Sequence, residues 1–357
     1  MAAKKGRVSW HTLAARLLLL AATSYGQLYF SYKFLVTSAA TSDFAQYYQI
    51  YRSPLNFHVA VAPFCLRQVS AALTFLVWKS HLFYPNQIQF VNTAFDQRIF
   101  FAALLTNWVC LILTAVVAGL LAEDLLGEVN TLAAILAGFL CMLSFHTQFV
   151  VITGLTEGPS WLLFALAMLA YRRRNKRSLL TALAVAIFQR ETILLAFAVI
   201  ATLSVVSELQ KRKGALPRLQ MNSFPLQTGL WATLFFLFYL GLRASVPGYE
   251  HQTHLTAIGA SLKEISWDGN LLFQGVLTQN VAIIAVFAGF SARRSLQGAL
   301  RWLGTLVVVL IALDSAGLAA GTGNNIGRIS GILTPAFAAL AAACLLSTQR
   351  ESLRYGQ

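Results

Sequence analysis

The sequence predicts an all-α, polytopic membrane protein with about 10–12 transmembrane helices, several of them short and broken. Three observations support this fold class. The chain of 357 residues is 57% hydrophobic and 11% charged, with a mean hydropathy of +0.64, whereas soluble domains carry about 25% charged residues. Apolar runs of about 20 residues recur along the whole length, and each can cross a hydrocarbon core about 30 Å thick. These runs are unbroken and do not alternate, which favours helices over the strands of a barrel.

The formal net charge of +14 is concentrated in short basic clusters between the apolar runs. In a soluble protein such a charge would suggest nucleic-acid binding, but in a membrane protein it is typical of cytoplasmic loops. We therefore predict a multi-pass protein of the bacterial inner (cytoplasmic) membrane that binds no nucleic acid, with both termini in the cytoplasm. The clusters that set this orientation are at 172–177, 210–218, 293–301 and 349–354.

The first third of the chain contains three predicted spans. We expect the first helix to be retained, because its apolar run is long and no convincing cleavage site follows it. Pro63 and Arg67 interrupt the second run, and the motif EDLLGE at 123–128 marks an acidic loop after the third. The predicted spans are Thr12–Val36, His58–Phe83 and Ile99–Ala122, with a first non-cytoplasmic loop at 37–57.

The middle of the chain carries apolar runs that are short for a membrane span. A helix of 14 residues measures about 21 Å, and such broken helices are tolerated where they line a cavity enclosed by protein or filled with water. The runs are Val129–Phe145, His146–Leu155, Gly158–Tyr171, Ser178–Phe188 and Thr192–Val206. The alternative for the last two is one tilted helix over Ser178–Val206, with Arg190 and Glu191 in mid-membrane. We prefer the broken version, because it keeps the basic clusters on one side.

The last third returns to conventional spans, and a second non-cytoplasmic loop at 247–270 separates the first two of them. We predict a single transmembrane domain over 1–357 with no soluble domain. The expected spans are Leu226–Val246, Leu271–Phe290, Ala299–Gly321 and Ile329–Ser347.

The sequence offers no metal centre or soluble-enzyme motif. The four cysteines stand alone within or beside apolar runs, so we interpret them as lipid-facing or core residues. His146, His251 and His254 lack metal-ligand spacing, and there is no P-loop, GxSxG or HExxH motif. The cysteines are Cys65, Cys110, Cys141 and Cys344.

Several polar residues fall on the non-cytoplasmic side in this topology, and we predict that they form a site. A carboxylate such as Asp43 can take a proton from an attacking hydroxyl. Arginines at the same level can hold a phosphate bidentately. The combination suits the transfer of a sugar from a polyprenyl phosphate. The convergent residues are Asp43, Glu157, Arg190, Glu191 and Arg328, the last in the loop GTGNNIGR.

Each candidate also has a structural interpretation. Asp43 can cap a helix, and Glu157 can cap the helix that starts near Pro159. Arg67 either extends to the membrane interface or meets a buried partner. Tyr47, Tyr48 and Tyr51 fit an interfacial aromatic belt. Arg190 and Glu191 fit a structural ion pair, and Asp314 is an embedded acid that an arginine could pair with.

These motifs, in this order, resemble the GT-C superfamily of integral membrane glycosyltransferases. Members carry an acid in the first non-cytoplasmic loop, and SDFAQYYQIYR is similar to that element, with Asp43 in the position of the acid. APFCLRQ, GLTEGPSWLL, FQRETILL and GRISGILTP resemble further elements of bacterial relatives. The chain departs from the family in having one acid in that loop, where two are frequent, and in lacking a large soluble domain.

The resemblance implies a function and a role for each residue. The protein would move a sugar from a polyprenyl-phosphate donor to a lipid or glycan acceptor, with inversion and with Asp43 as base. Arginines would bind the lipid phosphate or help to hold the site, and Glu157 and Glu191 would contact the sugar or orient those arginines. The implied substrate-binding residues are Arg67, Glu157, Arg190, Glu191, Arg328, Tyr47 and Tyr48. No metal or other cofactor is required, although Asp43 and Glu157 could share a divalent cation.

Two other classes fit the same pattern. A secondary transporter or lipid or sugar carrier would also show broken helices and polar groups within the membrane, although no repeat between the halves is evident. A non-catalytic membrane assembly subunit would use the polar groups for stability alone.

Overall fold

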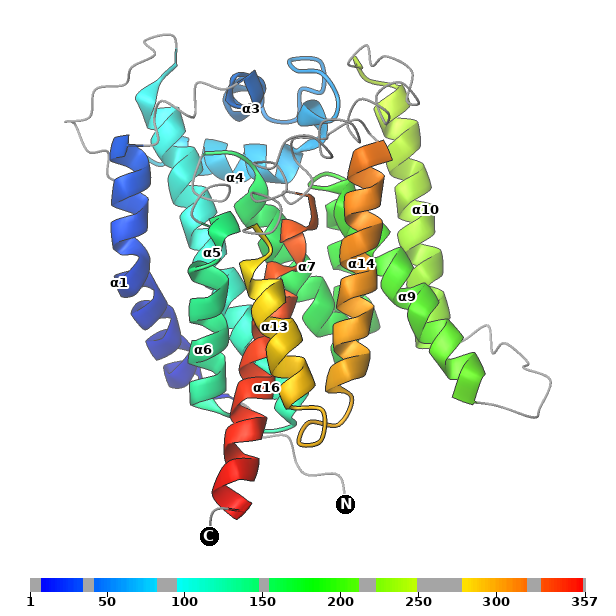
Figure 1. Ribbon diagram of the computed structural model, residues 1–357. Coiled ribbons are helices and arrows are strands. Elements are labelled where there is room, and N and C mark those ends of the chain that lie inside the picture. Colours follow the sequence, from blue (N-terminus) through cyan, green and yellow to red (C-terminus); the bar gives the residue numbers. More distant parts are fainter. Residues whose placement is uncertain are drawn as a thin grey trace, which may run out of the picture.

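The computed structural model describes residues 8–34, 42–81, 95–147, 154–211, 223–248, 278–319 and 329–355. Within these ranges every regular element is a helix (Figure 1). The elements are α1 (Trp10–Phe34), α3 (Ser42–Arg52), η1 (Phe64–Leu66), α4 (Gln68–Lys79), α5 (Gln97–Leu126), α6 (Thr131–Met142), α7 (Glu157–Arg172), α8 (Lys176–Ala186), α9 (Glu191–Lys211), α10 (Phe224–Ala244), α13 (Asn280–Ser291), α14 (Ala299–Ala319), η4 (Gly331–Leu333) and α16 (Thr334–Tyr355). The all-helical class is therefore confirmed for the described residues.

Five helices in the described ranges are long and apolar enough to cross a membrane, which supports a multi-pass integral membrane protein. They are Gln97–Leu126, Glu191–Gln210, Phe224–Ala244, Ala299–Gly317 and Gly331–Leu353. This number is below the predicted total of about 10–12. The difference arises largely because α6, α8 and α13 have only 11 or 12 residues and α7 has 16.

The centre of the bundle is formed by α5 and α16. In α5, 72% of the 18-residue apolar window is buried inside the protein, and in α16 the buried share is 89%. The corresponding share is only 22–33% in α9, α10 and α14. The start of α16 reads TPAFAALAAAC, and small side chains allow neighbouring helices to approach closely. Gly158 allows a similarly close approach of α7 to α5, because a Cβ at this position would lie only 2.6 Å from the Asn107 side chain of α5. The outer helices thus leave most of their apolar surface for lipid.

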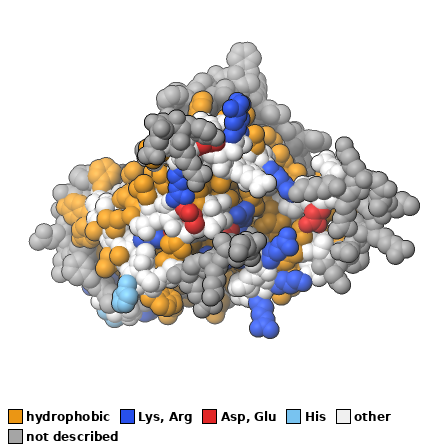
Figure 2. Space-filling model, turned by 90° about the horizontal axis from the view of Figure 1, so that it is seen from below, with side chains coloured by type: hydrophobic (Ala, Val, Ile, Leu, Met, Phe, Trp, Pro, Cys, Tyr) orange, Lys and Arg blue, Asp and Glu red, His pale blue; other side chains and the backbone are white. Residues whose placement is uncertain are grey.

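The two ends of the bundle differ. The first residues of α1 and the last residues of α16 lie at one end, which we call the lower end, and α3 and α4 lie across the opposite, upper end (Figure 1). Seen from below, Lys and Arg side chains are spread over the lower end (Figure 2). This distribution agrees with the predicted grouping of basic clusters on one side, and the cytoplasmic assignment of that side stays a prediction.

The predicted second span, His58–Phe83, is wrong. Residues 58–67 form turns and η1, and α4 has only 12 residues and lies across the upper end (Figure 1). The physical reason is that Arg67 and Gln68, at the start of α4, are both buried in polar contacts near the upper end. A span that carried them through lipid would lose those partners. The first loop, predicted as irregular, also contains a helix, α3.

The broken form of the middle segment is confirmed. Helix α8 ends at Ala186, and α9 begins at Glu191 after a turn. A single helix from 178 to 206 is therefore excluded. At 1.5 Å per residue, α7 is about 24 Å long and α8 about 17 Å, so both are shorter than a bilayer core. Most of the predicted run His146–Leu155 lies outside the described residues.

The EDLLGE segment holds four elements together at the lower end and is not a plain loop. Glu123 and Asp124 belong to the last turns of α5, and Gly127 ends that helix with a φ of 76°. Glu123 pairs with Arg16 of α1 at 2.7 Å, and Asp124 pairs with Arg172 of α7 at 3.0 Å. Glu128 pairs with Arg350 of α16.

Candidate functional site

Arg67 is held between two elements near the upper end of the bundle. It links η1 to α4, and its side chain is only 8% exposed. Its Nη1 lies 3.1 Å from Glu191 Oε2 and donates to the backbone carbonyl of Gln189 at 2.5 Å. Burial is the largest single influence on the pKa of the guanidinium and lowers it, but Glu191 and the neighbouring acidic groups together outweigh burial, so the pKa lies above its usual value. Arg67 is therefore a buried cation with a buried partner, which is the second of the two interpretations offered by the sequence.

A second buried pair lies beside the first. Arg190 directly precedes α9, and its Nη1 lies 3.3 Å from Oε1 of Glu157, the first residue of α7. The Glu157 side chain is 1% exposed and that of Arg190 is 10% exposed. A carboxylate at a helix N-terminus is also favoured by the helix dipole. Arg190 and Glu191 thus do not pair with each other, because each pairs with a residue from another element.

Gln189 connects the elements that carry the two pairs. Its Nε2 donates to the carbonyl of Thr156 and to the hydroxyls of Ser70 and Ser160, each at 2.8 Å, and its Oε1 accepts from the backbone N–H of Ser70 at 3.0 Å. The side chain is buried. One amide thereby fixes α4, α7 and the turn before α9 relative to one another.

Helix α3 covers this cluster with an aromatic face. The Tyr51 hydroxyl donates to the carbonyls of Gly154 and Leu155, both at 3.0 Å, just before Glu157. Burial raises the pKa of Tyr51 well above its ordinary value, so the hydroxyl stays a donor. Tyr47 stacks on Tyr51 with ring centroids 6.2 Å apart.

Asp43 lies on the same side of α3 as these two tyrosines. Residues at i, i+4 and i+8 share a helix face, so Asp43, Tyr47 and Tyr51 form one stripe. Asp43 is half-buried, one turn beyond Tyr47. Its place in the first turn of α3 also fits the expected helix-terminus role. Asp43 therefore stands one helical turn from Tyr47, which interacts electrostatically with Arg67.

The tyrosines do not form an exposed interfacial belt. Tyr47, Tyr48 and Tyr51 are 4%, 6% and 0% exposed. Tyr48 accepts a hydrogen bond from the Asp96 backbone N–H at 3.0 Å, and Arg52 lies over its ring. Tyr48 therefore helps to attach α3 to the start of α5, whereas Tyr47 belongs to the stripe over the cluster.

Two predicted features are outside the described residues. Arg328 and nearly all of the loop 247–270 lie there, so their relation to the cluster stays a prediction. Within the described ranges, no three or more His, Cys, Asp or Glu residues gather as metal ligands. A cation shared by Asp43 and Glu157 also stays a prediction. Asp314 accepts hydrogen bonds from Ser330, and no described arginine pairs with it.

The sequence reasoning missed Gln189, Tyr239 and Arg243. Tyr239 is 1% exposed on α10, next to Glu191 and Arg67, and Arg243 stands one turn further along. The sequence did contain a signal for Gln189, which directly precedes the RE doublet within an apolar segment. A glutamine that is buried in such a segment needs hydrogen-bond partners. Arg243 had a weaker signal, a cation at the upper end of an otherwise apolar span.

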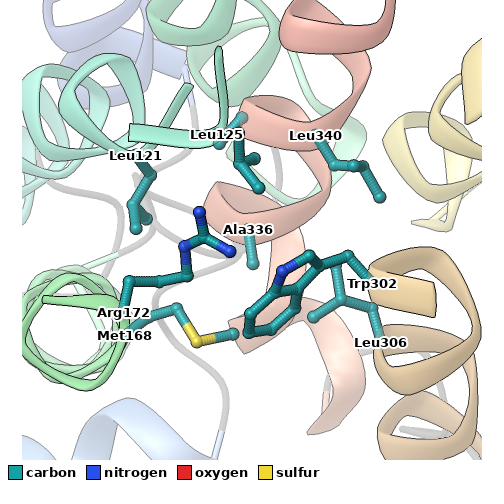
Figure 3. Close-up of a pocket in the computed structure, with 9 residues that line it drawn as sticks. Leu121, Leu125, Met168, Arg172, Trp302, Leu306, Ala336 and Leu340 are labelled. Atoms are coloured by element: carbon teal, nitrogen blue, oxygen red, sulfur yellow. The ribbon is translucent and has the colours of Figure 1, made fainter. Parts of the chain in front are cut away.

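Two apolar cavities lie in the membrane-facing region. An open, shallow apolar groove lies between α8 and α10, lined by Leu180, Thr181, Ala184, Val185, Phe188 and Phe235. Phe188 directly precedes Gln189 in the sequence. A second, small cavity lies near the lower end, where the guanidinium of Arg172 and the indole of Trp302 meet leucine side chains (Figure 3). Arg172 is paired with Asp124 there, so this cavity belongs to the helix packing.

Fold and site together define a helical, multi-pass membrane protein with a buried, charged cluster beneath a helical cover. Comparisons with protein-family models, curated proteins and solved structures find no match for this chain. The function must therefore be argued from the cluster itself.

Proposed function

We propose that this protein is a membrane glycosyltransferase of GT-C type. It moves a sugar from a polyprenyl-phosphate donor to a lipid or glycan acceptor at the non-cytoplasmic face, with inversion at the sugar carbon. Asp43 acts as the base that takes the proton from the acceptor hydroxyl. The phosphate of the donor leaves as polyprenyl phosphate.

One observation carries this proposal. Two acids and two arginines that are far apart in the sequence meet at the upper end of the bundle. They lie beneath α3, the helix that carries Asp43. Arg67–Glu191 and Arg190–Glu157 are both buried, with N–O distances of 3.1 and 3.3 Å. Keeping four charged side chains buried is costly unless each is paired. Their convergence in one buried cluster therefore supports a shared role better than four independent surface roles.

The geometry favours one of the two roles considered for the glutamates. Because each carboxylate lies against an arginine, Glu157 and Glu191 orient Arg190 and Arg67. The glutamates hold Arg67 and Arg190 in fixed orientations at the upper end, where the phosphate of the donor would bind. The open groove between α8 and α10 includes Phe188, which directly precedes Gln189 of the cluster, and it offers an apolar surface to a prenyl chain.

The test is turnover by wild type and by Asp43→Asn in purified membranes, given a panel of polyprenyl-phosphate sugars. We expect wild type to release polyprenyl phosphate from one donor, and Asp43→Asn to bind that donor but lose at least about a hundredfold in rate, as for removal of a general base. Release is measured by lipid mass spectrometry. Glu351→Gln, at the opposite end of the chain, is the matched control and should keep the wild-type rate.

Two results would overturn the proposal. In the first, wild type binds donors but transports them unchanged across vesicle membranes, which would favour the carrier. Alternatively, no donor is bound or consumed while Asp43→Asn only lowers the unfolding temperature, which would favour the assembly subunit and a capping role for Asp43.

A further inference from the structure

Two exposed arginines from separate elements lie together at the lower end of the bundle. Arg174 stands two residues beyond the end of α7, and Arg301 lies in the first turn of α14. Both are close enough to Tyr171 of α7 to interact with it electrostatically. We call the surface formed by Arg174 and Arg301 the basic corner.

Contacts beneath the basic corner hold the start of α14 against the end of α7. The guanidinium of Arg172 lies over the indole of Trp302, 4.9 Å from the ring centroid, and Figure 3 shows the two groups facing each other. Arg172 is also paired with Asp124 of α5 at 3.0 Å. Arg172 and Trp302 therefore serve helix packing, and Arg301, the neighbour of Trp302, is left exposed to the surroundings.

Arg174 occupies a backbone conformation that favours glycine. Its φ is 52°, in the left-handed region where helices commonly end on glycine. Its N–H donates to the Tyr171 carbonyl at 3.1 Å, and the next N–H, of Asn175, donates to the Ala170 carbonyl at 2.9 Å, which closes the end of α7. An L side chain in this conformation costs free energy. Such strain is a reason to ask what the side chain does.

The basic corner stands at the end of an exposed apolar stripe on α14. Arg301, Gly304, Val308 and Ile311 are spaced by three or four residues, so they follow one face of the helix. Val308 is 43% exposed and Ile311 is 56% exposed. A Cβ at Gly304 would meet no atom within 4 Å, so the face is also open next to Arg301. The surface thus has a cationic end and an apolar length, as an amphiphile with a negative headgroup requires.

The acids of this region do not cancel its positive charge. Asp124 is paired with Arg172, and Glu208 of α9 lies near Tyr171. The segment 173–177 alone contributes four cations, and all of its residues are exposed. Among the described residues of this region the balance is therefore positive, and it adds to the attraction of an anion at the basic corner.

We propose that the basic corner and the outer face of α14 bind an anionic phospholipid of the adjacent leaflet. The headgroup phosphate contacts Arg174 and Arg301, and an acyl chain lies along the stripe through Val308 and Ile311. Arginine matches phosphate oxygens in charge and geometry, and basic residues at the membrane surface attract anionic lipids. The continuous apolar face selects a lipid over a free phosphate ion or a nucleic acid, since neither of these would use it.

A lipid held in this way would join two parts of the bundle. Only 28% of the apolar window of α14 is buried, so α14 is one of the outer helices. A phosphate bound by both arginines would connect the start of α14 to the end of α7. The proposal goes beyond sugar transfer and does not depend on it, because the basic corner is at the end of the bundle opposite the charged cluster.

The test measures binding of dioleoyl phosphatidylglycerol and dioleoyl phosphatidylcholine to the full chain in detergent by native mass spectrometry. We expect Arg301→Gln and Arg174→Gln each to weaken phosphatidylglycerol binding about fivefold, as for one basic residue near an anionic surface, and the double variant about 25-fold. Arg301→Lys should keep most of the binding. Phosphatidylcholine should bind more weakly and respond little to these changes.

Arg294→Gln is the matched control, because it removes an exposed arginine from the same end of the molecule. Its neighbour Ser295 is hydrogen-bonded to Ser347 of α16 at 3.1 Å, so this turn lies against another helix. Binding should change less than twofold in Arg294→Gln. All variants should unfold at the wild-type temperature without lipid, and phosphatidylglycerol should raise that temperature more for wild type than for the double variant.

A label on the wild-type protein gives a second measurement that needs no variant. A phosphatidylglycerol with a photoreactive acyl chain should label α14. The inference is overturned if the label lies elsewhere, if Arg294→Gln weakens binding as much as the double variant, or if phosphatidylcholine binds equally well. Displacement of the lipid by an equal concentration of inorganic phosphate or of an oligonucleotide would also overturn it, since the apolar face would then contribute nothing.

Discussion

At the scale of single residues, Gln189 is the hydrogen-bonding centre of the cluster. Its amide satisfies the Thr156 carbonyl, the Ser160 hydroxyl and the backbone N–H of Ser70 in a site closed to water. A buried polar group that loses its partner costs about 1–3 kcal/mol, and here several groups depend on one side chain. Its importance therefore comes from its number of partners.

We predict that Gln189→Leu destabilises the protein by about 2–5 kcal/mol, since more than one group loses its partner. Thermal unfolding in detergent, followed by tryptophan fluorescence, measures the effect. Gln49→Leu is the control, because Gln49 is exposed on α3 and should change the unfolding temperature little. Equal unfolding temperatures for Gln189→Leu and wild type would show that Gln189 does not hold α4 and α7 together.

At the scale of elements, the helices are joined by charged contacts at both ends. The lower-end pairs differ in burial: Arg16 and Glu123 are 4% and 6% exposed, whereas Arg350 and Glu128 are 47% and 46% exposed. Glu123 also accepts from the Asn130 backbone N–H at 3.0 Å, where α6 begins. Glu123 thus joins α1, α5 and the start of α6.

We predict that Glu123→Gln costs about 3–5 kcal/mol, because it leaves Arg16 as a buried cation without a counter-charge. The matched variant Glu128→Gln should cost less than about 1 kcal/mol, since its pair is exposed. Chemical unfolding of both variants gives the comparison. Similar losses for the two would mean that burial of the pair does not decide its contribution.

At the scale of the whole molecule, the bundle has a basic end and a covered end. Ser53 is exposed after α3 at the upper end, and Gln349 is exposed on α16 near the lower end. The four native cysteines are buried, so a cysteine introduced at either position can be labelled selectively. Positive residues gather on the cytoplasmic side of membrane proteins, which predicts that the lower end faces the cytoplasm.

We predict that a membrane-impermeant maleimide labels Ser53→Cys in intact cells, and labels Gln349→Cys only after the membrane is opened. Wild type should remain unlabelled in both conditions, which serves as the control. The reverse pattern would place the cluster at the cytoplasmic face and would remove the basis for a donor site on the far side.

Local pattern was enough to predict much of this organisation. Hydrophobic run length predicted α1, α5, α10, α14 and α16, because the length of an apolar run and its flanking charges are properties of neighbouring residues. The QRE break was also predictable, since three polar residues cannot continue a lipid-facing helix without partners. The positions of the basic clusters placed Glu157, Arg190 and Glu191 on one side of the membrane, and the structure brings these residues into one cluster.

By itself, then, the sequence determined the helical membrane class, the broken middle and most members of the cluster. Only the tertiary structure decided that Arg67 pairs with Glu191, 124 positions away, and that α4 lies across the bundle. It alone brought Arg243 of α10 close to Glu191. The physical reason is that such pairings depend on how distant helices pack, and helix packing is set by the shapes of whole faces, which no short stretch of sequence contains.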